Sequence, residues 1–206
     1  MDTLDLIIRD TNNITLLWKE AAHEGIPPSS AAQKIDDAMF DWMRELTKTL
    51  RIWTDKGARM TSGELILARA NLGAIVESWL KFFYCAYNEE YKKKPKTRSG
   101  NIIEPNDLGF EDLRQYSRGI IYQSNDSWEQ WIDSVQKKRN AIHSFNYREI
   151  GISDDYYDDV EKLFDFIHLI YDHLPPVEDY ILAYPAGYEM PVPNVNRTKI
   201  RRVFDF

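Results

Sequence analysis

Apolar residues recur every three or four positions along most of the chain, which is the period of an α-helix. The first such run covers residues 4–24 and stops at a glycine that is soon followed by paired prolines. A second run, capped by Ser30, extends to about Lys56 with the same spacing of apolar residues: Ile35, Met39, Trp42, Met43, Leu46, Leu50 and Trp53. Both segments are predicted to be helices.

The third segment, residues 61–91, runs without proline and opens with Thr61 and Glu64 at the spacing of a capping box. Its apolar residues from Ile66 to Tyr87 surround the helix axis on all sides, which predicts the central and most buried helix. The basic stretch KKKPKTRSGN that follows is predicted to be a solvated loop.

The rest of the chain predicts a shorter helix in residues 109–122, one from Ser127 to about Phe145, and a last long one capped by Ser153 and closed by paired prolines. We find no repeat and no convincing strand pattern. The predicted fold is all-α, a bundle of four to five helices with short connections. Its parts are an N-terminal helix and turn (1–29), the bundle (30–180) and an extended C-terminal tail (181–206), which either wraps its own domain or docks on a partner.

Composition narrows the class of protein. The net charge of −7 argues against nonspecific coating of nucleic acid. The single cysteine, Cys85, excludes a disulfide framework and indicates a reducing compartment. Without an apolar run near the roughly 18 residues of a membrane span, a soluble cytoplasmic protein is expected. No metal or cofactor is predicted, because the carboxylates of residues 153–161 have no histidine or cysteine beside them and suit helix capping.

The candidate chemistry lies in QKKRNAIHSFNYREIG, residues 136–151. At about 100° per residue from Trp128, a buried stripe forms from Trp131, Ile132, Val135 and Ile142. Arg139 falls within that stripe and His143 on its border, while Lys138 lies about 80° away. A guanidinium stays charged in proteins, so Arg139 requires an acidic partner or an open cleft.

Arg139 and His143 lie one helical turn apart, where their side chains can converge on one ligand. Arginine offers a planar fork to phosphate oxygens, and histidine transfers protons near neutral pH. The pair therefore suits phosphate chemistry. Spacing alone favours another interpretation, in which Arg139 pairs with an acid such as Glu77 and His143 is a hydrogen-bonded residue near a helix end.

The segment KKRNAIHSF, placed after the long helix ARANLGAIVESWLKFFYCAYNEEY, resembles the HEPN (higher eukaryotes and prokaryotes nucleotide-binding) family over residues 30–180. The family motif is an arginine, usually followed by a polar residue, and a histidine after four to six intervening positions. Here Asn140 follows Arg139, but three residues separate Arg139 from His143; counting from Lys138 gives four.

The resemblance implies a metal-independent endoribonuclease of toxin or antiphage-defence type that acts as a homodimer on RNA, with an antitoxin or defence-system protein as a further partner. In this interpretation Arg139, Asn140 and His143 are catalytic, and Lys138, Glu77 and Tyr147 contact the substrate. The alternative is a catalytically inactive HEPN-type module that binds a nucleotide, RNA or a protein.

Overall fold

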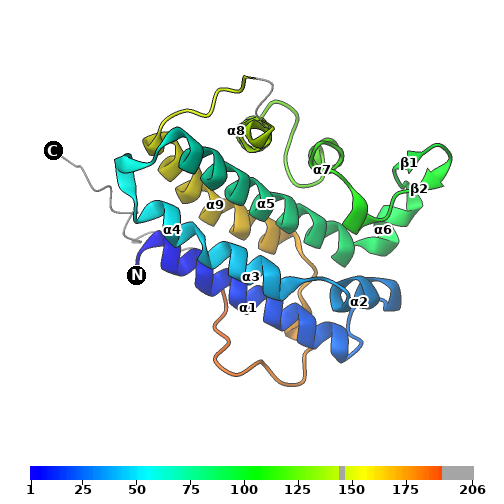
Figure 1. The fold of residues 1–206 in the computed structure, drawn as a ribbon. Helices are drawn as coiled ribbons and strands as arrows, with labels where there is room; N and C mark the ends of the chain where they lie inside the picture. The colour runs from blue at the N-terminus through cyan, green and yellow to red at the C-terminus, as the bar shows by residue number, and fades with distance from the viewer. Residues whose placement is uncertain (144–146, 192–206) are drawn as a thin grey trace.

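Helices form almost all the regular structure of the protein (Figure 1), whose computed structural model describes residues 1–143 and 147–191. The only described strands are β1 (Thr97–Arg98) and β2 (Asn101–Ile102), which form a short antiparallel pair. The predicted all-α class is confirmed. The stretch predicted to be a loop contains all of this hairpin except Ile102, and the two-residue strands are too short to show an alternating pattern.

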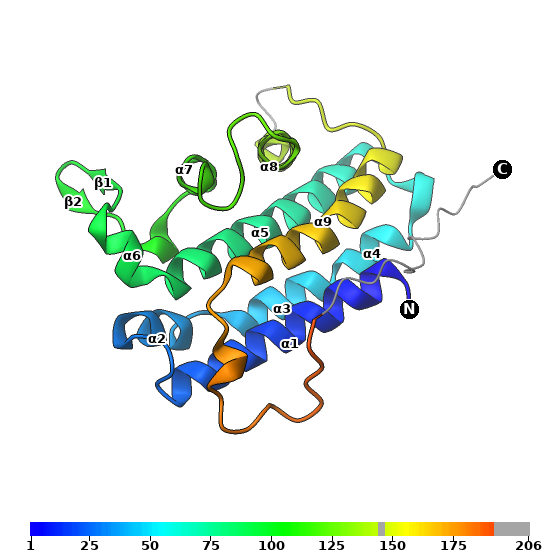
Figure 2. The same cartoon turned by 180° about the vertical axis from the view of Figure 1, so that it is seen from behind.

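The bundle has three layers (Figures 1 and 2). The middle layer is α5 (Ser62–Ala86) beside α9 (Ser153–His173), and α1 (Thr3–His23) packs below it with α3 (Phe40–Lys48). On the opposite side, α7 (Phe110–Ser117) and α8 (Ser127–Arg139) cross over α5. The remaining short elements are α2 (Ser29–Asp36), α4 (Leu50–Thr54), η1 (Gly57–Arg59), α6 (Asn88–Lys93), η2 (Pro105–Asp107), η3 (Asn140–Ile142) and η4 (Val177–Asp179).

The central helix α5 begins with the predicted capping box. The Thr61 amide donates to the Glu64 carboxylate (2.8 Å), and the Glu64 amide donates to the Thr61 hydroxyl (3.3 Å). Trp79 and Leu80 are fully buried, as a core helix requires. Among the described helices, none is both long enough and apolar enough to cross a membrane.

The predicted single helix from Ser30 to Lys56 is wrong, because the segment is divided into α2, α3 and α4. The break before α3 turns Phe40 into the core, where its ring meets the Phe82 ring edge-on at 5.1 Å. It also leaves Met39 and Trp42 on the surface. Burial of Phe40 therefore favours a bend between α2 and α3 that helical periodicity does not encode.

The start of α9 also differs in detail from the prediction. The residue before the helix is Ile152, whose amide donates to the Asp155 carboxylate (2.9 Å), so Ser153 is the first helical residue and not the cap. The capping role predicted for the carboxylate run holds for Asp155. Asp159, two turns after the cap, has another role described below.

The described part of the C-terminal tail, residues 181–191, contains no helix or strand and lies beside α1 (Figures 1 and 2). The Leu182 amide donates to the Glu24 carboxylate (3.0 Å), and the Asn13 side chain donates to the Glu189 carbonyl (3.1 Å). This part therefore wraps its own domain. The aromatic residues at the end of the tail, Phe204 and Phe206, lie outside the described residues.

Candidate functional site

The motif lies where α8 ends. The α-helix stops at Arg139 and continues as the 3-10 turn η3 over residues 140–142, whereas the predicted end was near Phe145, which lies outside the described residues. A 3-10 turn advances about 120° per residue, so the α-helical phase is lost after Arg139. The predicted burial of Trp131, Ile132 and Val135 is confirmed, but that of Ile142 is wrong: it is 48% exposed.

Arg139 reaches from α8 to α5. Its Nη2 donates to Glu77 Oε2 at 3.0 Å, and its Nη1 lies 3.4 Å from the Asn140 side-chain oxygen. The Arg139 side chain is 35% exposed and that of Glu77 13%, so the pair sits at the edge of the core. Glu77 also pairs with Lys81 at 3.2 Å. Two cations thus surround one carboxylate, which leaves a net positive charge that attracts anions.

Gly73 allows this contact. A methyl group added at Gly73 would lie 2.5 Å from both Cβ and Cγ of Arg139, so the end of α8 rests directly on the backbone of α5. Glu77 is one helical turn further along, where it meets the guanidinium. Sequence reasoning missed Gly73, although a glycine inside a strongly helical pattern is the signal of such a close approach.

We expect Gly73→Ala to lower the free energy of unfolding by about 1–3 kcal/mol, because the new methyl group displaces Arg139. Denaturant unfolding measures this change. Gly63→Ala is the matched control in the same helix. A methyl group added at Gly63 would have no neighbouring atom within 4 Å, so alanine there should leave the free energy of unfolding unchanged or raise it. Equal effects of the two substitutions would contradict the close packing at Gly73.

His143 follows η3 and is exposed. Its backbone amide donates to the Asn140 carbonyl (3.2 Å) and closes the turn. Within residues 1–143 and 147–191, no side-chain hydrogen bond holds the imidazole ring. The ring is therefore accessible to a ligand and can exchange protons with it.

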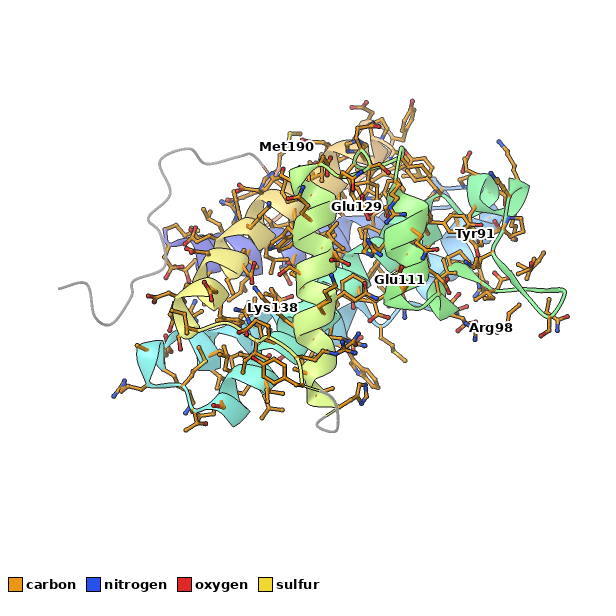
Figure 3. The ribbon with its side chains drawn as sticks, turned by 90° about the horizontal axis from the view of Figure 1, so that it is seen from above. Tyr91, Arg98, Glu111, Glu129, Lys138 and Met190 are labelled. Carbon is orange, nitrogen blue, oxygen red and sulfur yellow. The ribbon has the colours of Figure 1, made fainter. Side chains whose placement is uncertain are left out.

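The other two predicted substrate contacts bind acids outside the Arg139 site. Lys138, at the C-terminal end of α8 (Figure 3), donates to Asp159 of α9 at 2.9 Å. Tyr147 is 87% exposed and donates to the Glu149 carboxylate (2.8 Å), which raises the pKa of the Tyr147 hydroxyl. The structure thus brings Glu77, Arg139 and Asn140 together, and it places Lys138 and Tyr147 elsewhere.

Among the described residues, the most deeply buried basic side chain is that of Arg69, which sequence reasoning missed. It lies on α5, is 1% exposed and pairs with Asp159; its Nε donates to the Ile150 carbonyl (3.1 Å). Trp131 donates to the same carboxylate at 2.8 Å. Asp159 therefore joins α5, α8 and α9. The contacts of Lys138 and Ile150 anchor both ends of the segment that carries His143.

Two further residues with reactive side chains lie in the core. Burial raises the pKa of the Cys85 thiol to about 12, so Cys85 is a poor nucleophile, as the sequence pattern predicts. His168 lies 3.0 Å from the buried Asp10 carboxylate on α1, whereas His173 is exposed. The described residues hold no cluster of three metal-ligating side chains.

Comparison of the chain with protein-family models, curated proteins and solved structures finds no match. The chemistry of the site is therefore argued from its own residues. They provide a half-buried guanidinium oriented by an acid, an amide beside it, and an exposed imidazole four residues further along the chain.

Proposed function

We propose that the protein is a cytoplasmic, metal-independent endoribonuclease of toxin or antiphage-defence type, with Arg139, Asn140 and His143 as its catalytic residues. The observation that carries this proposal is the accessibility of the motif. Arg139 is held by Glu77 yet keeps about a third of its side chain open, and His143 is exposed. Each group is therefore reachable from solvent without unfolding the core.

In the proposed reaction, the ribose 2′-oxygen forms a bond to the adjacent phosphorus while the bond from phosphorus to the 5′-oxygen breaks. A base removes the 2′-hydroxyl proton, and an acid protonates the leaving 5′-oxygen; His143 serves in these transfers. Arg139 stabilises the negative charge that grows on the phosphorane oxygens. Asn140, next to the guanidinium, orients the phosphate. DNA lacks the nucleophile and is not cleaved.

An in-line displacement places the attacking and leaving oxygens on opposite sides of phosphorus, so one imidazole cannot serve both. We propose that a second copy of the chain supplies the other His143. An exposed apolar residue in the motif supports such a contact: Ile142 on η3 is 48% exposed. A symmetric dimer would remove it from water.

We expect the protein to sediment as a dimer and Ile142→Glu to shift it toward monomer, because a carboxylate in an apolar interface is costly. Sedimentation equilibrium measures both, and cleavage activity should fall with the dimer fraction. Ile120→Glu is the control, because Ile120 is also an exposed isoleucine and lies outside the motif. A fully active monomer would exclude the shared site.

The direct test is incubation with a short single-stranded RNA in the presence of EDTA. Cleavage should leave a 2′,3′-cyclic phosphate, persist with the chelator and stop when a deoxyribose replaces the ribose 5′ of the cut. His143→Ala should reduce its rate by about 10²-fold or more. Cleavage that needs a metal, or whose rate His143→Ala leaves unchanged, would overturn the proposal.

Two observations favour a second candidate, the inactive HEPN-type module. Arg139 is already hydrogen-bonded to Glu77 at 3.0 Å, and only three residues separate it from His143. In that case the site binds RNA, a nucleotide or a protein partner, such as an antitoxin, without cutting. Binding that Arg139→Ala weakens, in a protein that never cleaves RNA, would establish the module instead.

A further inference from the structure

A cavity of about 380 Å³ lies at the other end of α5, away from the motif, where α5 meets α6 and α7. Five aromatic rings line it: Phe83, Tyr84, Tyr87, Tyr91 and Tyr116. The lining is completed by Glu90, Lys94, Ile120 and His173. Figure 3 labels Tyr91 on the far side of α7 from α8. The volume is within the range of small-molecule sites.

The rings are held in place by hydrogen bonds to the backbone. The hydroxyl groups of Tyr87, Tyr91 and Tyr116 donate to the carbonyls of His173, Ile103 and Lys94, each at 2.7 Å. Because these hydroxyls already have acceptors, the cavity presents ring carbon to a ligand: Tyr87 and Tyr116 are half-buried, and Phe83, Tyr84 and Tyr91 pack behind them with 3–5% of their surface exposed. Tyr84 stands nearly perpendicular to two neighbours, at 88° to Phe83 and 85° to Tyr116. The walls therefore form a rigid cage that needs little ordering on binding.

The electrostatics of the cage favour a cation. Helix α9 ends at His173, whose carbonyl accepts the Tyr87 hydroxyl, whereas α5 runs on into α6 after Tyr87. The C-terminus of a helix carries partial negative charge, and so do the faces of aromatic rings. Glu90 adds an exposed carboxylate to the lining.

Lys94 is the opposing charge in the lining, and its side chain is exposed. A primary ammonium is strongly hydrated and remains in water, whereas a methylated ammonium gives up its hydration more easily. The cage therefore discriminates in favour of the bulkier, weakly hydrated cation.

We propose that this cavity binds an organic cation through a methylated or quaternary ammonium group, with the aromatic rings around the charge and Glu90 at the entrance. Aromatic cages recognise such groups by cation–π attraction. The site is separate from the proposed ribonuclease motif, so either proposal can fail without the other.

The probe is choline, compared by calorimetry with the neutral alcohol in which carbon replaces the choline nitrogen. Choline should bind saturably and about tenfold more tightly than the alcohol, because only the cation gains cation–π energy. Equal affinity for the two compounds, or no saturable binding of choline into the millimolar range, would overturn the proposal.

Four variants locate the binding. Tyr116→Leu should weaken choline binding roughly tenfold, while Tyr116→Phe keeps the ring and most of the affinity. Glu90→Gln should weaken binding and Lys94→Gln should strengthen it, and both residues are exposed, so folding is preserved. Circular dichroism checks the fold of Tyr116→Leu. Affinity that is unchanged in both Tyr116→Leu and Glu90→Gln would exclude this cavity as the site.

Discussion

Replacing Asp159 by alanine should lower the free energy of unfolding by about 3–5 kcal/mol, because it leaves a buried charge without its partner. The charge is Arg69, which is 1% exposed and pairs with Asp159. The same substitution removes the acceptor of the Trp131 indole and of the Lys138 ammonium. For a domain with a total stability of about 5–15 kcal/mol, this is a large fraction.

Denaturant unfolding of Asp159→Ala beside Asp154→Ala tests the expectation. Asp154 is an exposed carboxylate in the first turn of the same helix, so its loss should cost less than about 1 kcal/mol. The double substitution Arg69→Met with Asp159→Leu should be less destabilising than the sum of the two single substitutions, because it leaves no buried charge without a partner. If Asp159→Ala and Asp154→Ala were equally stable, Asp159 would not hold the three helices together.

The second large effect is on the proposed cleavage of RNA. His143→Ala should reduce the cleavage rate by about 10²–10⁴-fold, the contribution of a positioned acid or base. Arg139→Ala should reduce it by about 10²–10³-fold through loss of charge stabilisation. Because His143 is exposed, its removal should leave the free energy of unfolding within about 0.5 kcal/mol of the parent protein.

Two further variants separate position from charge. Arg139→Lys retains the positive charge but loses the planar fork, so cleavage should remain strongly impaired. Lys137→Ala removes a cation that is 68% exposed on the same helix and pairs with Asp133, and it should change the rate by less than about twofold. If Lys137→Ala were as slow as Arg139→Ala, the effect would come from general attraction of RNA and not from a placed guanidinium.

Several features follow from local patterns and could be predicted. The bounds of α1 and the capping of α5 depend on residues within a turn or two of each other, and helical periodicity encodes them directly. The pairing of Arg139 with Glu77 could also be predicted from the sequence. A permanent charge on an apolar stripe requires an acidic partner, and Glu77 interrupts the most apolar helix.

Other features depend on contacts that no local pattern contains. The division of residues 30–56 into three helices and the change to a 3-10 turn after Arg139 both alter the register of the apolar stripe. A helical wheel assumes one continuous period, so it placed Ile142 in the core. The choice between a continuous helix and a divided one depends on packing, such as the burial of Phe40 against Phe82.

The local pattern established that the chain is a helical bundle in which one helix ends in a basic stretch, with a histidine shortly after it. Which cation lies in the core was decided only by the folded arrangement. Among the described residues, Arg69 is the buried cation because Asp159, 90 residues away in the sequence, packs against it, while Arg139 stays at the edge of the core beside Glu77. Periodicity states which face of a helix turns inward; the neutralisation of a charge on that face depends on a partner brought from another helix.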